Sequence, residues 1–187
     1  MELLTPFTFE MTVYDFMQKA LYFDPSEFIL ECKSLELPKA FNHWQCPENF
    51  DSITYGQRID LSGINSTNFI TLPLFIIAGL DESNIAQLNA SKVLRFSFMA
   101  IDEMTKMNER DEKYLTYEPE EAELKAGVKK MNHGIFGVID TIAKRCPQYT
   151  HEEVLKLGQQ QVYMMLKIDI DNANYAKRLR KVLSEKK

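Results

Sequence analysis

Apolar residues recur along much of this chain at the three- and four-residue spacing of an α-helix. In the clearest stretch, residues 124–142, apolar positions advance by four, three, four, three and four, so their side chains share one helical face. Residues 94–104 step by four, three and three, which predicts another helix. Apolar and polar residues also alternate across 93–101, so a strand is the alternative there.

Residues that favour helix starts predict further elements. The Thr12 hydroxyl stands where it can accept a hydrogen bond from the N–H of Asp15 in a first helical turn. Pro25 suits a first helical position, because the N–H that it lacks has no partner there. Thr54–Gln57 and Thr150–Glu153 have the spacing of capping boxes. We therefore expect helices over about residues 12–23, 25–33, 54–61, 150–171 and 175–184.

Four other segments have a less regular pattern. Residues 35–51 contain two prolines and several turn-forming residues, which predicts an irregular connection anchored by Trp44. Residues 3–9 predict a brief strand. The apolar run 69–80 predicts a buried helix, with a buried strand as the alternative. The charged residues 108–119 predict a break between helices.

The composition favours a mainly α fold of about six to eight helices, with at most a small β element near the N-terminus. Only seven Gly and seven Pro stand against twelve Phe, eight Tyr and nine Met. This argues against Gly-rich phosphate-binding α/β enzymes and turn-dense sandwiches. Gly127, Gly134 and Gly137 lie inside the predicted helix over 124–142. Because each costs about 1 kcal/mol relative to alanine there, we expect close packing against them.

We expect residues 1–187 to form a single domain. The chain has no internal repeat, low-complexity tract or Ser/Gly linker. Residues 108–119 are the predicted place of any sub-boundary, and residues 174–187 are predicted to form a basic C-terminal helix.

The sequence predicts a soluble intracellular protein. Glu2 and Glu10 lie near the N-terminus without the basic stretch of a secretory signal, and the apolar run 69–80 is too short to span a bilayer. The three cysteines are widely spaced and form no CxxC pair, which disfavours a disulfide framework and suits a reducing cytoplasm.

Motifs for catalysis or metal binding are incomplete in this sequence. The chain has no GxSxG motif, Gly-rich phosphate loop or dinucleotide fingerprint. His43 and Cys46 form one ligand pair where a structural zinc site needs two. Asp169–Asp171 lacks the glycine and final glutamate of a calcium loop. We therefore expect no catalytic residue, cofactor or metal; the alternative is an enzyme whose site gathers His43, His133 or His151 with acidic residues.

Charge is distributed unevenly along the chain, whose net charge is −5. Residues 102–123 carry −6, whereas residues 177–187 carry +5. A basic helix on an acidic body predicts a docking arm for an acidic surface or a local nucleic-acid contact. The third interpretation is a solvated helix end, because the helix dipole favours cations there. The acidic body disfavours nucleic acid, so we favour head-to-tail contact between copies, which closes into a ring where the rotation permits.

The candidate interaction residues lie in these two charged segments, with one aromatic anchor between the predicted helices. They are Trp44, Glu109, Asp111, Glu112, Glu118, Glu120, Glu121, Lys177, Arg178, Arg180 and Lys181. The expected partners are other proteins and further copies of this chain, and no membrane.

Two stretches share a pattern with a known class of protein. In the first, Leu37-Pro38 is followed by Trp44 and then by Ile53-Thr54-Tyr55-Gly56-Gln57, continuing to Leu61. In the second, residues 149–155 continue through a run that includes Val162 and Leu166. Together they resemble small structural and assembly proteins of tailed bacteriophages, in particular tail-assembly chaperone-like proteins. The resemblance covers about forty residues, and the two helices predicted before Leu37 stand where such proteins begin with a short strand.

The resemblance implies a non-enzymatic protein that works through protein–protein contacts in several copies. It implies a tail chaperone, connector or ring component, located in the host cytoplasm during assembly or in the virion. Two alternatives come from other classes: a small intracellular enzyme, and a nucleic-acid-binding regulator that uses the basic C-terminal helix.

Overall fold

The computed structural model describes residues 6–128 and 133–185, and the chain folds into two compact units. The first comprises Met1–Phe50 and Asp60–Thr105, and the second comprises Asp51–Ile59 and Lys106–Lys187. The expectation of a single domain with a sub-boundary at 108–119 stays a prediction.

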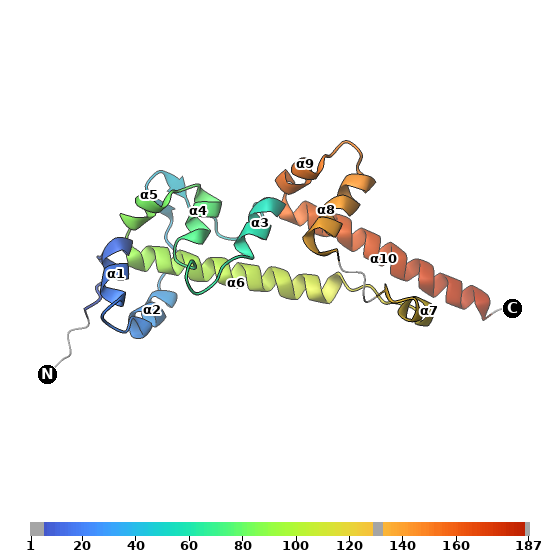
Figure 1. Ribbon diagram of the computed structural model, residues 1–187, viewed down its shortest axis with the longest axis horizontal. Coiled ribbons are helices and arrows are strands. Elements are labelled where there is room, and N and C mark those ends of the chain that lie inside the picture. Colours follow the sequence, from blue (N-terminus) through green and yellow to red (C-terminus); the bar gives the residue numbers. More distant parts are fainter. Residues whose placement is uncertain (1–5, 129–132, 186–187) are drawn as a thin grey trace. The chain divides into compact units, whose positions relative to one another are not determined.

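The first unit contains short helices, one small hairpin and the first part of a long helix (Figure 1). Its elements are α1 (Val13–Ala20), α2 (Ser26–Lys33), β1 (Ala40–Phe41), β2 (Trp44–Gln45), α4 (Leu72–Ala78), α5 (Glu82–Ala86) and residues 90–105 of α6 (Ala90–Tyr114). As predicted, the Thr12 hydroxyl accepts a hydrogen bond from the N–H of Asp15, at 3.1 Å, where α1 begins.

Aromatic side chains fill the core of the first unit. Phe96, fully buried on α6, has its ring centroid 5.9 Å from that of Phe41 and 6.4 Å from that of Phe50. Between α1 and α2 the buried rings of Phe16 and Phe28 lie 5.6 Å apart. Each fully buried side chain of this size stabilises the fold by about 1.5–3 kcal/mol, so much of the chain's Phe content serves this core.

In the second unit, α8 and α9 lie against the N-terminal half of α10 (Figure 1). Its elements are most of α3 (Tyr55–Leu61), the end of α6, α7 (Glu121–Lys125), α8 (Gly134–Arg145), α9 (His151–Lys156) and α10 (Gln159–Ser184). Its buried core consists of Tyr55, Ile139, Ile142, Val154 and Val162. Two backbone hydrogen bonds, Tyr55 N–H to the Leu157 carbonyl and Gln159 N–H to the Ile53 carbonyl, join the start of α3 to the start of α10.

Both predicted capping boxes form. The N–H of Gln57 donates to the Thr54 hydroxyl at 3.1 Å, and the Gln57 side-chain carbonyl accepts from the N–H of Thr54 at 2.9 Å. At α9 the N–H of Glu153 donates to the Thr150 hydroxyl at 3.2 Å, while the Glu153 carboxylate accepts from the N–H of Thr150 at 2.7 Å. These exchanges satisfy backbone donors that a helix start otherwise leaves unpaired.

The mainly α prediction is confirmed, with ten helices in the described residues where the sequence indicated six to eight. The small β element is also present but lies within residues 35–51, which were expected to be irregular. The hairpin turns at Asn42, whose φ of 51° is left-handed, a conformation that Asn tolerates better than most residues. Residues 6–9, the described part of the strand predicted over 3–9, form no strand.

The continuous helix predicted over 124–142 is wrong. α7 ends at Lys125 and α8 begins only at Gly134. Gly127 has φ of 86° and Gly134 has φ of 53°, and these left-handed conformations interrupt a right-handed helix. Close packing is found instead at Gly137, where an added Cβ would lie 2.6 Å from the Cβ of His133. The predicted stripe also includes position 131, which lies outside the described residues.

The predicted break over 108–119 is wrong in its first half. α6 continues through Tyr114, and residues 93–101 are helical rather than a strand. Glu, Arg, Lys and Met are good helix formers, so the charged residues extend the helix instead of ending it. The run 69–80 forms α4 over Leu72–Ala78 only; Leu74 is fully buried, but Phe75 is 54% exposed.

The two helices predicted over 150–171 and 175–184 are divided at a different place. Leu157 is extended, with ψ of 148°, and α10 then runs without interruption from Gln159 to Ser184. The break occurs where the backbone of Leu157 pairs with that of Tyr55. The pattern near Asp171 therefore marks no helix end, since its carboxylate accepts a hydrogen bond from Lys167 one turn earlier on the same helix.

Candidate interaction surfaces

Trp44, the predicted anchor of residues 35–51, packs against the aromatic core of the first unit. On β2 it stacks against Phe41 at 6.4 Å, and it meets Phe96 edge to face at 5.5 Å. Its side chain is only partly buried. Its contacts therefore hold the hairpin against α6.

The acidic segment, residues 109–123, and the basic tail, which starts at Lys177, contact each other within one chain. The ammonium of Lys177 donates to the carboxylate of Glu123 at 2.8 Å and to the backbone carbonyl of Glu118 at 2.6 Å. It also lies 3.4 Å from the ring centroid of Tyr117, a cation–π distance. Only 10% of the Lys177 side chain is exposed. We call this group, completed by Asn174, the α7–α10 contact.

Asn174 holds the backbone of the acidic segment. It is 9% exposed; its Oδ1 accepts from the N–H of Glu118 at 3.3 Å, and its Nδ2 donates to the carbonyl of Thr116 at 3.1 Å. The N–H of Glu120 donates to Glu123 at 2.8 Å and completes the start of α7. The acidic segment is therefore positioned by backbone hydrogen bonds as well as by charge.

The hydrogen bonds at the α7–α10 contact shift two pKa values. The pKa of Glu123 is lowered to about 2, first by the hydrogen bond from Lys177 and then by those from the Tyr117 hydroxyl and the Glu120 N–H. For Lys177, desolvation lowers the pKa, but the interactions with Glu123 and Tyr117 outweigh it, so the net shift is upward. Both shifts favour the charged forms.

The remaining basic residues border an open groove of about 700 Å³. Its lining residues are Glu118, Pro119, Glu120, Lys177, Arg178, Arg180, Lys181 and Ser184. Arg180 reaches Glu120 at 3.7 Å, a long and largely exposed ion pair of little stabilising value. The groove thus exposes basic side chains beside an acidic segment.

The other acidic candidates do not share one site. Glu109 and Glu112 are exposed on α6, and Glu121 pairs with Lys125 along α7 at 2.7 Å. Asp111 instead binds Arg58 at 2.7 Å, with both side chains largely buried. Only Glu118 and Glu120 among the acidic candidates line the groove beside the basic tail.

Sequence reasoning missed the polar cluster around Asp111. Arg110 donates to Asp111 at 3.2 Å and to the Oε1 atoms of Gln159 and Gln160 at 3.2 and 2.7 Å. Its guanidinium lies 3.8 Å from the ring centroid of Tyr163. This cluster joins α6 to the start of α10 through residues about 50 positions apart in the sequence. No local sequence pattern therefore predicts it.

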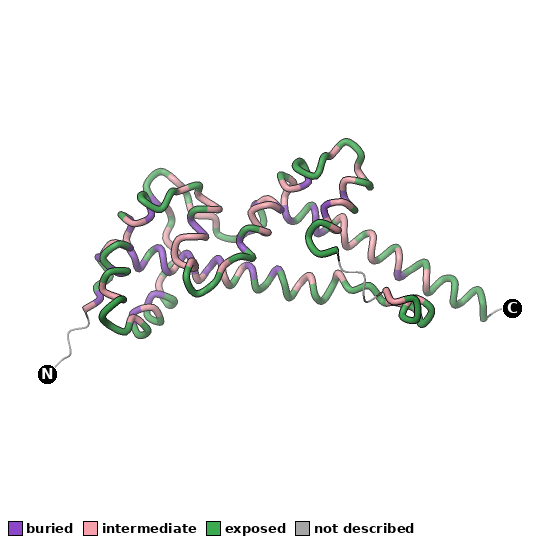
Figure 2. The backbone as a smooth tube through the Cα atoms, in the orientation of Figure 1, coloured by how far each residue is buried: buried purple, intermediate pink, exposed green. Residues whose placement is uncertain are grey.

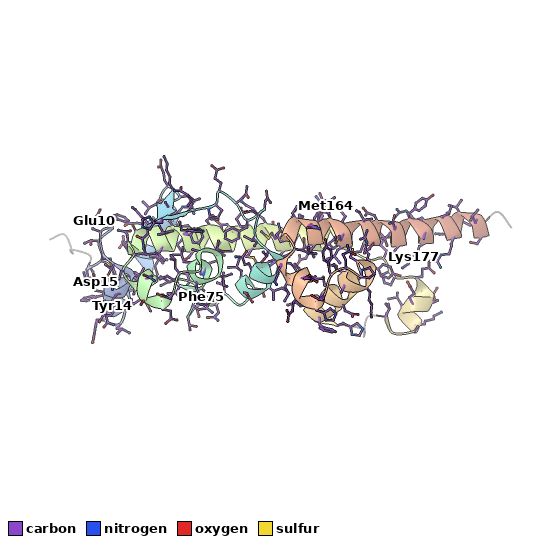
Figure 3. The ribbon with its side chains drawn as sticks, turned by 90° about the horizontal axis from the view of Figure 1, so that it is seen from above. Glu10, Tyr14, Asp15, Phe75, Met164 and Lys177 are labelled. Carbon is purple, nitrogen blue, oxygen red and sulfur yellow. The ribbon has the colours of Figure 1, made fainter. Side chains whose placement is uncertain are left out.

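Large apolar side chains are exposed over α1, α2 and the turn between them. The α1–α2 surface consists of Tyr14 (56% exposed), Met17 (47%), Leu21 (71%), Tyr22 (81%), Phe23 (53%) and Leu30 (70%). Figure 3 shows Tyr14 at the outer edge of this unit. Exposed apolar groups of this size are typical of binding surfaces.

A second group of exposed apolar side chains lies on α10. Figure 2 shows the C-terminal part of this helix as mostly exposed. The α10 stripe consists of Ile168 (43% exposed), Tyr175 (59%), Leu179 (42%) and Val182 (49%).

The histidines and cysteines form no site among the described residues. His43, His133 and His151 are all exposed, and none lines the groove or the smaller hollow of about 320 Å³ beside α1. Burial raises the pKa of the Cys32 thiol to about 11, with a further contribution from Glu31, and raises that of Cys46 to about 11, which disfavours reactive thiolates. No group of three potential ligands is placed to hold a metal within the described residues.

Comparisons with known protein families, curated proteins and solved structures find no match to this chain. Among the helices that the structure describes, none combines the length and the apolar character needed to cross a membrane.

Proposed function

We propose that this chain is a non-enzymatic virion or assembly protein of a tailed bacteriophage, and that it acts through protein–protein contacts in several copies. The observation that carries the contact function is the α1–α2 surface, where six large apolar side chains between residues 14 and 30 are exposed. Covering them with a partner removes apolar area from water, at about 25 cal/mol per Å² before the costs of association.

The assignment to a phage rests on the resemblance of residues 37–61 and 149–166 to tail-assembly chaperone-like proteins. In both stretches a capping box begins a helix, at Thr54 and at Thr150. The proposed place of action is the host cytoplasm during assembly or the virion itself. Tail chaperone, connector and ring component are the roles that the proposal includes.

The test is genetic and uses the phage or prophage that encodes the chain. An early stop codon in the gene is expected to abolish infectious particles and leave incomplete particles in electron micrographs. Normal yields of infectious particles would contradict the proposal.

A surface variant then tests whether the α1–α2 surface is required for particle assembly. The triple variant L21S/Y22S/F23S changes exposed side chains only and is expected to fold but to assemble no particles. Phe136→Ser is the control, because Phe136 is 63% exposed on α8, outside this surface. If the triple variant supports assembly as well as Phe136→Ser does, the α1–α2 surface is not the contact site.

A further inference from the structure

The α10 stripe has the spacing of a coiled-coil seam. Ile168, Tyr175 and Val182 recur every seven residues, and Leu179 lies four residues after Tyr175. Asn172 occupies the equivalent position four residues after Ile168 and is also exposed. In heptad notation, Asn172 and Leu179 are a positions, and the three residues spaced by seven are d positions.

The opposite face of α10 is already occupied by its own chain. The acidic segment is contacted by Asn174, Lys177 and Arg180, which are the c, f and b positions of the same heptads, respectively. Figure 3 shows Lys177 on the side of α10 that faces α7 and Met164 on the opposite side. The α10 stripe therefore points away from the α7–α10 contact and is left without a partner within the described chain.

We infer that the α10 stripe binds the same stripe of a second copy of this chain as an antiparallel helix pair. This inference rests on the proposed function and names one of its partners. In the antiparallel register, Asn172 lies opposite Tyr175 of the second copy, and Ile168 lies opposite Leu179 of the second copy. The pair is isologous, because each contact occurs twice about a two-fold axis.

Charge complementarity selects the antiparallel orientation. The g positions beside the seam are Asp171 and Arg178. In an antiparallel pair, Asp171 of each copy lies beside Arg178 of the second copy. Arg178 has no ion pair within the described chain, and the Asp171 carboxylate already shares one exposed hydrogen bond with Lys167. Both side chains are thus accessible for the two intermolecular ion pairs.

A parallel pair lacks these ion pairs. It would place the basic residues 177–181 of one copy beside the same four basic side chains of the other, and like charges repel. It would also set Asp171 beside Ala176 and Arg178 beside Leu183, without charge pairing. In the antiparallel pair the basic end of α10 lies beside the end that carries Asp169 and Asp171. Such a dimer closes on itself, whereas the head-to-tail contact predicted from charge forms rings.

Sedimentation equilibrium of the full chain over a wide concentration range tests the pairing. The chain is expected to be a dimer at high concentration and to dissociate on dilution. Leu179→Arg should be monomeric throughout. The control is Phe136→Arg, which also places an arginine at an exposed apolar position, on α8 and outside both the stripe and the α1–α2 surface, and it should dimerise like the unmodified chain. Circular dichroism verifies that each variant keeps its helices.

Charge exchange tests the orientation. Asp171→Arg and Arg178→Asp should each weaken dimerisation at least fivefold, and the double variant should restore most of the affinity, because the two charges exchange places across the pair. An unmodified chain that stays monomeric, equal loss of dimerisation in Phe136→Arg, or a double variant that dimerises no better than either single variant would each overturn the inference. A monomeric chain whose gene is still essential for particle assembly overturns the pairing and leaves the proposed function intact.

Discussion

The ammonium of Lys177 lies 2.8 Å from the carboxylate of Glu123 and attaches the acidic segment to α10 within one chain. The charge pattern predicted contact between these two segments from different copies. The intramolecular contact uses Lys177 and leaves Arg178 and Lys181 exposed beside the groove. A head-to-tail assembly through the same charges would have to compete with a contact that the chain already makes.

Replacing Lys177 by Met should loosen the acidic segment while leaving the helical content unchanged. Methionine keeps much of the side-chain length but removes the hydrogen bonds to Glu123 and the Glu118 carbonyl. Hydrogen exchange of the backbone amides over residues 116–125 should become several-fold faster. Arg178→Met is the matched control and should leave these rates unchanged, because Arg178 makes no ion pair within the described chain.

The α7–α10 contact should persist to unusually low pH. Because the folded pKa of Glu123 is about 2, below the ordinary glutamate value of 4.5, its stabilising effect is fully present above pH 4.5. The effect is lost progressively as the pH falls from 4.5 towards 2. Urea midpoints of the unmodified chain and Glu123→Gln, followed by circular dichroism, should differ most above pH 5 and converge near pH 2. A difference that stayed constant over this range would show that the charge of Glu123 does not contribute.

Substitutions at Gly134 should destabilise the fold through the backbone alone. Its φ is 53°, and a Cβ added there meets no atom within 4 Å. Gly134→Ala should therefore cost about 1 kcal/mol of unfolding free energy, because a Cβ disfavours left-handed backbone. Gly134→Asn should cost less and Gly134→Val more, and urea denaturation gives the order. Equal costs for all three would exclude backbone conformation as the cause.

Asp111→Asn should destabilise the second unit by about 2 kcal/mol, because it leaves Arg58 and Arg110 largely buried without their carboxylate. Urea unfolding measures the change. Glu109→Gln, on an exposed position of the same helix, should change the free energy by less than about 0.5 kcal/mol. If the two variants were equally stable, Asp111 would have no structural role in the cluster.

Local interactions explain which elements could be predicted from the sequence. The caps at Thr12, Thr54 and Thr150 each need only two residues three positions apart, and all three form. The helix expected over 124–142 failed because a hydrophobic period does not reveal backbone angles, and Gly127 and Gly134 adopt left-handed ones. The hydrophobic period predicted which side chains share a helical face, but it did not predict whether they belong to one continuous helix.

The candidate site was predictable only in part, for a related reason. The two charged segments could be predicted as candidates because charge can be read from the sequence. The side chains that their residues contact could not be predicted. Lys177 is hydrogen-bonded to Glu123, 54 positions away in the sequence, and Arg110 to Gln159, 49 positions away. The exposure of Tyr22 and Leu179 likewise depends on what the rest of the chain covers.

By itself, the sequence determined that this is a mainly helical chain and where several of its helices begin, because helix caps and apolar periods act over a few residues. Only the tertiary structure decided that α6 and α10 run as long uninterrupted helices, that the acidic segment contacts its own basic tail, and which apolar side chains stay exposed. Those outcomes depend on contacts between residues far apart in the chain, and on the burial that such contacts produce.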